Sequence, residues 1–178
     1  MKTRDYWSTP WELIDFIQDF AGYRFAVDAC AEEWNRVAAT WLDADHVYHR
    51  EHGGMTYNRD GAIWCNPPFS RLGSFVDECL LFRAASVVFL GPNDCSTLWF
   101  QKLAKRANRI LFLRPRVQFI PPPGVKPSSN SGSNVVFFIE NLQTRRGIKS
   151  GCYLGDWKTR DVTHLGFGGS KCYGGGVK

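Results

Sequence analysis

Apolar and polar positions alternate between two spacings over the first two thirds of the chain. After Thr9-Pro10-Trp11-Glu12, which fits a capping box with proline at the first helical position, apolar residues recur at helical spacing until Gly22 can close the helix. Further helices are predicted over 32–41, from Leu72 to Ala84, and from Asp94 to about Ala107. Short apolar runs predict strands at 24–29, 62–65, 86–90, 109–113 and 135–139, with a further short strand at 117–120.

Alternating helices and strands indicate an α/β fold with a mostly parallel central sheet and helices on both faces. Residues 43–60 and 121–134 show no period and predict loops; the second is long, which in a compact domain is typical of functional or mobile segments. Beyond Asn141 the chain becomes basic and then glycine-rich. The sequence therefore predicts one minimal domain over 1–145 and a poorly ordered tail over 146–178.

Composition places this domain among ordinary globular proteins. Of 178 residues, 44% are hydrophobic, enough for a core, and no apolar run is long enough to span a bilayer. Six cysteines without a Cys-x-x-Cys pair, and no export signal, favour free thiols in a cytoplasmic protein. The net charge of +5 favours a polyanionic partner.

The segment Asn66-Pro67-Pro68-Phe69 follows the predicted strand at 62–65 directly. Neither proline can donate a hydrogen bond and each fixes its own φ, so the strand must stop in a stiff turn. The Asn66 amide oxygen and the Pro67 carbonyl can both accept hydrogen bonds from one small amine, with the Phe69 ring alongside. This arrangement suits a planar substrate that carries an amino group.

Two other polar segments also follow predicted strands. Asp28-Ala29-Cys30 ends the strand at 24–29, and Gly91-Pro92-Asn93 ends the strand at 86–90. Ligands of parallel α/β sheets lie outside the carboxyl ends of the strands, so these segments and Asn66 are expected to meet at one edge.

Asn66-Pro67-Pro68-Phe69 resembles the catalytic motif of S-adenosylmethionine-dependent amino-methyltransferases. Several further segments, in this order, make the chain similar to the phage-type DNA N6-adenine methyltransferase (Dam-like) family from about Trp7 to Ile139. They are Trp7-Ser8-Thr9-Pro10-Trp11-Glu12, Phe25 to Ala31 with Asn35, Gly91 to Asp94 with Trp99-Phe100, and Arg109 to Leu113. The resemblance implies a Rossmann-like methyltransferase fold, S-adenosylmethionine as cofactor, and a bacterial or phage-infected cell as the setting.

The resemblance also implies roles for individual residues. Asn66 and Pro67 would accept hydrogen bonds from the adenine amine, and Phe69, held by Pro68, would stack on a base flipped out of duplex DNA. The expected cofactor contacts are Thr9 and Pro10, at the methionine end, and Asp28, Ala29 and Cys30. A glycine-rich loop is absent, since Asp28-Ala29-Cys30-Ala31 stands at its place.

An aromatic amine is a poor nucleophile because its lone pair is delocalised into the ring. Two acceptors on its N–H groups oppose that delocalisation and stabilise the positive charge that methyl transfer puts on nitrogen. Cytosine N4, RNA adenine or a protein glutamine could be held in the same way. A catalytically silent nucleic-acid-binding protein of this fold is the alternative outside enzymes.

Basic residues mark a candidate DNA surface. Arg114, Arg116 and Lys126 surround the start of the long loop at 121–134 and are expected to contact phosphates. His46, His49 and His52 match no common zinc spacing, and no metal is expected. The sequence carries no signal for an oligomeric state.

Overall fold

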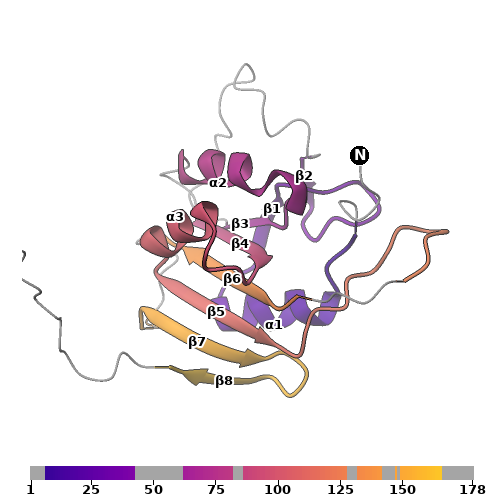
Figure 1. Ribbon diagram of the computed structural model, residues 1–178. Helices are drawn as coiled ribbons and strands as arrows, with labels where there is room; N and C mark the ends of the chain where they lie inside the picture. Colours follow the sequence, from indigo (N-terminus) through magenta and orange to yellow (C-terminus); the bar gives the residue numbers. More distant parts are fainter. Residues whose placement is uncertain are drawn as a thin grey trace, which may run out of the picture.

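The computed structural model describes residues 7–42, 62–81, 86–127, 132–141, 147 and 149–165 (Figure 1). The helices are α1 (Trp11–Ala21), the 3-10 helix η4 (Phe69–Arg71), α2 (Leu72–Leu81) and α3 (Leu98–Arg106). The strands are β1 (Phe25–Asp28), β2 (Thr40–Trp41), β3 (Ala62–Cys65), β4 (Ser86–Pro92), β5 (Arg109–Arg114), β6 (Asn134–Ile139), β7 (Gly151–Asp156) and β8 (Asp161–His164).

All the described strands form one mixed sheet in the order β2-β1-β3-β4-β6-β5-β7-β8. β1 is parallel to β2 and β3, and β3 is parallel to β4. β6 runs antiparallel to both neighbours, β4 and β5, and β8 runs antiparallel to β7. The carboxyl ends of β4, β5 and β7 therefore share one edge, on the right in Figure 1. The predicted mostly parallel sheet is confirmed.

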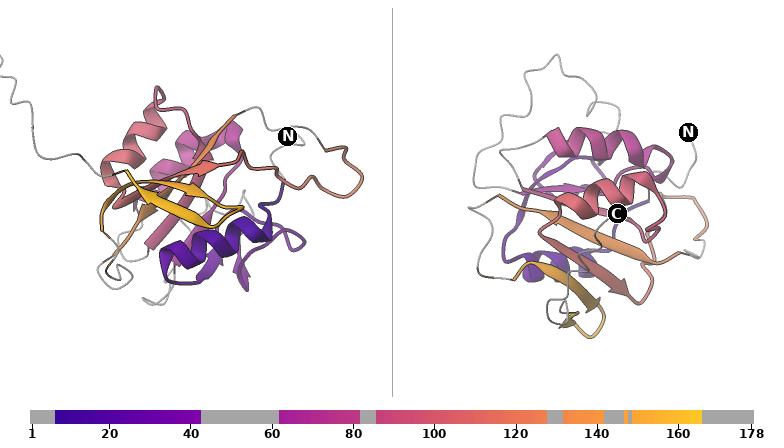
Figure 2. Two further views of the ribbon diagram at one scale, coloured as in Figure 1. Left: turned by 90° about the horizontal axis from the view of Figure 1, so that it is seen from below. Right: turned by 60° about the vertical axis from the view of Figure 1, so that its left-hand side comes forward.

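Helices cover both faces of the sheet, as the sequence predicts (Figures 1 and 2). On one face, α1 buries Leu13, Ile14 and Ile17 against Trp64 and Val88. On the other, α2 packs with α3 over side chains of β3, β4 and β6. Each strand of the centre is thus buried on both sides, which explains why β3 and β6 read as continuous apolar runs.

The predicted helix over 32–41 is wrong. Turns follow β1 instead, and the segment ends in the short strand β2, which pairs with β1. The Asn35 side chain accepts a hydrogen bond from the Glu32 N–H at 2.6 Å, a local bond that competes with helix formation. The predicted strand at 117–120 is likewise reduced to one antiparallel bridge between Ser8 and Ile120.

The start of α1 also differs from the predicted capping box. Pro10 takes the N-cap position, and no side chain caps the helix. The end agrees with the sequence, because Gly22 has the left-handed conformation (φ 80°) and its N–H donates to the Gln18 carbonyl. Thr9 is therefore available for another contact.

Strands β7 and β8 lie within the stretch that the sequence assigns to a tail. β7 pairs with β5 from Arg109↔Gly151 to Arg114↔Asp156, and β8 pairs with β7. The predicted domain boundary near residue 145 thus falls inside the sheet, while residues 166–178 of the predicted tail lie outside the described residues. The short, polar β8 has no strong apolar pattern, so its pairing is decided by its neighbour β7.

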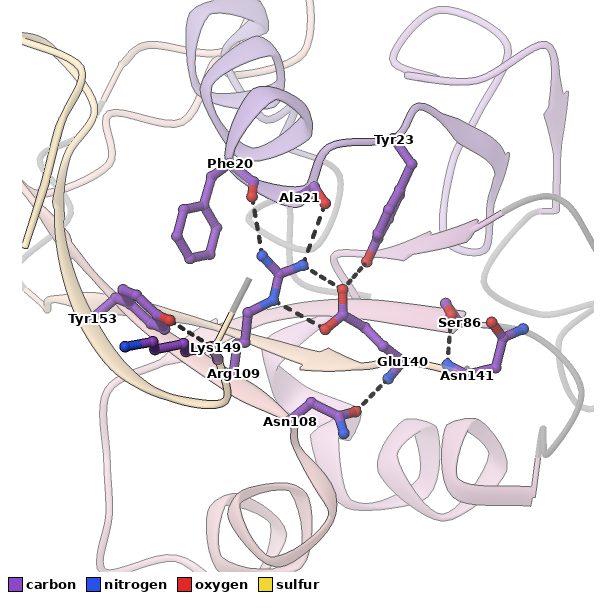
Figure 3. Close-up of polar contacts among 10 residues, drawn as sticks. All are labelled: Phe20, Ala21, Tyr23, Ser86, Asn108, Arg109, Glu140, Asn141, Lys149 and Tyr153. Atoms are coloured by element: carbon purple, nitrogen blue, oxygen red, sulfur yellow. Dashed lines mark hydrogen bonds and ion pairs between the residues drawn. The ribbon is translucent and has the colours of Figure 1, made fainter. Parts of the chain in front are cut away.

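A buried ion pair holds α1 to the edge of the sheet that lies opposite the carboxyl ends (Figure 3). The side chains of Arg109 and Glu140 are 2% and 1% exposed, and Arg109 Nε donates to Glu140 Oε2 at 2.9 Å. The guanidinium also donates to the carbonyls of Phe20 and Ala21, at 3.0 and 3.4 Å, and so satisfies the end of α1. The Tyr23 hydroxyl donates to Glu140 at 3.0 Å, and burial raises the pKa of Tyr23 strongly.

Within the described part of the chain, none of the helices combines the length and the apolar character that a membrane crossing requires.

Candidate active site

The predicted site segments do meet at the carboxyl edge of the sheet. Asp28 is the last residue of β1 and pairs in register with Trp64 of the neighbouring strand β3. Asn66 is the first residue after β3. Gly91 and Pro92 end β4, the next strand along, and the Asn93 N–H donates to the Ser133 carbonyl. The parallel register of β1, β3 and β4 is the reason for this convergence.

Asn66 is held from the N-terminal segment. Its Nδ2 donates to Thr9 Oγ1 at 3.0 Å, and Thr9 itself is 5% exposed. The sequence assigns Thr9 to the cofactor and to a helix cap, but the structure places its hydroxyl on the amide of Asn66. The pairing joins residues 57 positions apart, so no local pattern could have revealed it.

The rest of the motif forms the predicted stiff turn. Pro67 and Pro68 are buried, and the Pro68 carbonyl accepts from the Arg71 N–H at 2.9 Å in the helix η4. The Phe69 ring is 39% exposed and meets the ring of Phe119 edge to face, with centroids 6.0 Å apart. The sequence analysis did not include Phe119 in the site; the signal for it was the mostly apolar run Val117 to Ile120, predicted as a short strand.

Asp28 is 3% exposed and its carboxylate is bound by backbone groups. Its oxygens accept from the N–H of Cys30 at 3.2 Å and of Val37 at 3.0 Å, so Asp28 shapes the turn after β1. Burial raises the pKa of Asp28 to about 6, against the opposing effect of these two bonds. A cation or a hydroxyl group that reaches this carboxylate would stabilise its charged form.

Ala29 and Cys30 pack into the core on the face of the sheet that α2 covers. Ala29 is buried in that core, and its N–H donates to the Trp64 carbonyl. Cys30 Sγ lies 3.7 Å from Cys65 Sγ, which lies 3.8 Å from Cys79 Sγ. Burial raises the pKa of the Cys30 and Cys65 thiols, so these thiols are protonated at neutral pH and pack as small uncharged side chains.

The three predicted phosphate contacts are all exposed: Arg114 is the last residue of β5, and Arg116 and Lys126 follow it in the chain. Arg114 pairs with Asp156 at 3.5 Å, whereas Arg116 and Lys126 lie on the segment that extends from the sheet in Figure 1. Of the three, Arg116 lines a groove of about 690 Å³. It is lined by Pro10, Trp11, Glu12, Pro115, Arg116, Gln118, Ile120, Trp157 and Lys158.

Among the described residues, no group of three or more histidine, cysteine or acidic side chains is arranged so that it could hold a metal ion. The three histidines considered in the sequence, His46, His49 and His52, lie outside the described residues.

Comparison with known proteins gives the family. The model of the family "DNA N-6-adenine-methyltransferase (Dam)" matches residues 1–160. The chain belongs to this Dam family. The match extends past Ile139, where the resemblance in the sequence fades, and takes in β7 and the turn that follows it.

Two phage proteins are among the relatives. The "DNA N-6-adenine-methyltransferase" of Haemophilus phage HP1 is 28% identical over 153 residues, which cover 83% of this chain and 85% of that protein. The protein of the same name from Escherichia phage T1 is 30% identical over 160 residues, 79% of this chain and 64% of the relative. No solved structure matches the chain significantly.

Family membership confirms the predicted activity: this Dam-family chain is an adenine-specific DNA methyltransferase that uses S-adenosylmethionine. DNA is accordingly its substrate. The roles of individual residues rest on the geometry above.

Proposed function

We propose that Asn66, Pro67 and Phe69 hold the N6 amine of an adenine flipped out of duplex DNA, in a Rossmann-like methyltransferase fold. The observation that carries this proposal is the position of Asn66. It follows β3 at the carboxyl edge of the sheet, next to the buried Asp28 at the end of β1. In sheets of this type, ligands bind at that edge.

Methyl transfer to this amine requires hydrogen-bond acceptors on its N–H groups rather than a general base. Asn66 Oδ1 and the Pro67 carbonyl accept hydrogen bonds from the two N–H groups of the amine. These bonds localise the lone pair on nitrogen and stabilise the positive charge that develops there. The exposed Phe69 ring offers a stacking face, and its edge contact with Phe119 fixes the ring plane. Pro68 contributes stiffness, which keeps these groups in place.

Residues at the end of β1 fit the cofactor. The Asp28 carboxylate is buried, and in the described contacts only backbone N–H groups face it, so an ammonium or ribose hydroxyls would complete its environment. Pro10, Ala29 and Cys30 would contribute backbone and apolar contacts. When bound, S-adenosylmethionine supplies the electrophilic methyl group.

Expression in a bacterium that lacks its own DNA methylation tests the target. We expect N6-methyladenine in DNA, and much less of it with the Asn66→Ala variant, measured by mass spectrometry of nucleosides. N4-methylcytosine without N6-methyladenine would contradict the geometry proposed for the base, and modification found in RNA alone would contradict duplex DNA as the partner.

The raised pKa of Asp28 predicts a pH effect on stability. Between about pH 4 and pH 6 the folded protein binds more protons at Asp28 than the unfolded chain does, so stability falls as pH rises through this window. The fall attributable to Asp28 is at most about 3 kcal/mol. Urea unfolding of the wild type and of Asp28→Asn across this range measures it, since the asparagine variant does not titrate. Equal pH dependence in both proteins would contradict the assignment.

The exposed cations beyond β5 support a DNA surface next to this site. Arg116 lines the groove with Trp11, which is 58% exposed, and with Pro10. Pro10 follows Thr9, whose hydroxyl accepts from Asn66. A cation and an exposed aromatic ring in one groove match the two kinds of contact that DNA offers, to phosphates and to bases.

Removing these charges should weaken the salt dependence of DNA binding. For Arg116→Gln and Lys126→Gln we expect the slope of log affinity against log salt to fall by about 1 each, measured on a duplex oligonucleotide. Arg114→Gln should change the slope less, because Asp156 already compensates its charge. Lys105, an exposed cation in the last turn of α3 at the opposite edge, is the matched control. An unchanged slope in the Arg116/Lys126 double variant, or an equal loss in Lys105→Gln, would contradict this surface.

A further inference from the structure

The amide of Asn66 has two chemically different ends, and only one of them can accept a hydrogen bond from adenine. The terminal torsion of asparagine is soft, so the side chain does not choose between its two orientations by itself. With Nδ2 turned toward the target, two donors would face each other. The proposed chemistry therefore requires a neighbouring group that holds Nδ2 away from the base.

Thr9 has the position to do this. Its Oγ1 accepts from Asn66 Nδ2 at 3.0 Å, which leaves Oδ1 on the other side of the amide. The residue is 5% exposed, so water does not compete freely for the hydroxyl.

The backbone on both sides of Thr9 is fixed. Ser8 and Ile120 exchange two hydrogen bonds, of 2.8 and 2.9 Å, which tie the N-terminal segment to the residue after Phe119. On the other side, the Pro10 carbonyl accepts from Leu13 and Ile14 in the first turn of α1. Because no side chain caps α1, the Thr9 hydroxyl is free of the role that the sequence suggests for it.

We propose that Thr9 is a positioning residue that orients the Asn66 amide, so that Oδ1 faces the N6 amine. This inference rests on the proposed catalytic role of Asn66 and goes beyond the cofactor contact that the resemblance implies for Thr9. The coupling runs from the N-terminal segment through one hydroxyl to the reacting atoms.

Thr9→Val keeps the shape of the side chain and removes the hydroxyl, while Thr9→Ser keeps the hydroxyl. For Thr9→Val we expect kcat to fall roughly tenfold, the size of one hydrogen bond to a neutral group, with KM for DNA and the dissociation constant of S-adenosylmethionine within about twofold of wild type. Thr9→Ser should stay within about twofold of the wild-type kcat. Thermal unfolding of both variants confirms that each is folded.

A double-mutant cycle separates this inference from the proposed function. If Thr9 acts through Asn66, the variant Thr9→Val/Asn66→Ala is no slower than Asn66→Ala. Thr9→Val with normal kcat, or with a weakened cofactor and unchanged kcat, overturns the positioning role while a slow Asn66→Ala still supports the site. Thr9→Ser as slow as Thr9→Val also overturns it. Near-normal turnover of Asn66→Ala overturns the proposed function itself.

Discussion

Asn66→Ala is expected to lower kcat about 10²-fold, the usual loss for one preorganised contact to a developing charge. The alanine variant removes the only side-chain acceptor that the motif offers to the amine. Binding of S-adenosylmethionine should change far less. The proposed cofactor contact is Asp28, at the end of the neighbouring strand β1, whereas the Asn66 side chain is hydrogen-bonded to Thr9.

Single-turnover assays with a duplex substrate measure this effect, and calorimetry measures cofactor binding in the same preparation. Asn66→Asp is the matched comparison: it keeps an acceptor at the same place and should lose less activity than the alanine variant. Turnover by Asn66→Ala within a few-fold of wild type would show that the turn after β3 does not hold the reacting amine.

Glu140→Ala is expected to cost about 3–5 kcal/mol of folding free energy, the largest effect on stability that the structure predicts. The variant leaves the guanidinium of Arg109 buried without its carboxylate, and it also removes the acceptor of the Tyr23 hydroxyl. A loss of this size is a large part of the total stability of a typical domain. Figure 3 shows Arg109 and Tyr23 directed toward the Glu140 carboxylate.

Urea unfolding provides the measurement, and two variants sharpen it. Asp77→Ala breaks the exposed pair between Lys102 and Asp77, 2.6 Å apart, and should cost less than about 1 kcal/mol. Arg109→Met/Glu140→Leu removes both buried charges and should lose less than the sum of the single variants, since no charge is left unpaired. Equal losses for the buried and exposed pairs would contradict the structural role of the cluster.

Strongly patterned elements were predictable because local sequence decides them. β3, β4, β5 and β6 are apolar runs that only a doubly covered strand can bury, and Gly22 ends α1 in a conformation that glycine adopts without strain. The helix expected at 32–41 was wrong because that segment has no strong period, and a side-chain bond from Asn35 with strand pairing to β1 decided its structure.

The turn from Asn66 to Phe69 was likewise predictable from the sequence, since two prolines shortly after an apolar run force a rigid turn at a strand end. What the sequence determined by itself was thus the family, and the edge of the sheet where the motif lies; the chemistry of the motif is the proposal made from it. Only the tertiary structure decided that Thr9 serves Asn66 rather than the helix cap, that Phe119 meets Phe69, and that β7 extends the sheet. These contacts join residues far apart in the chain, and packing of the whole domain brings them within hydrogen-bond distance or ring contact, where no local pattern records them.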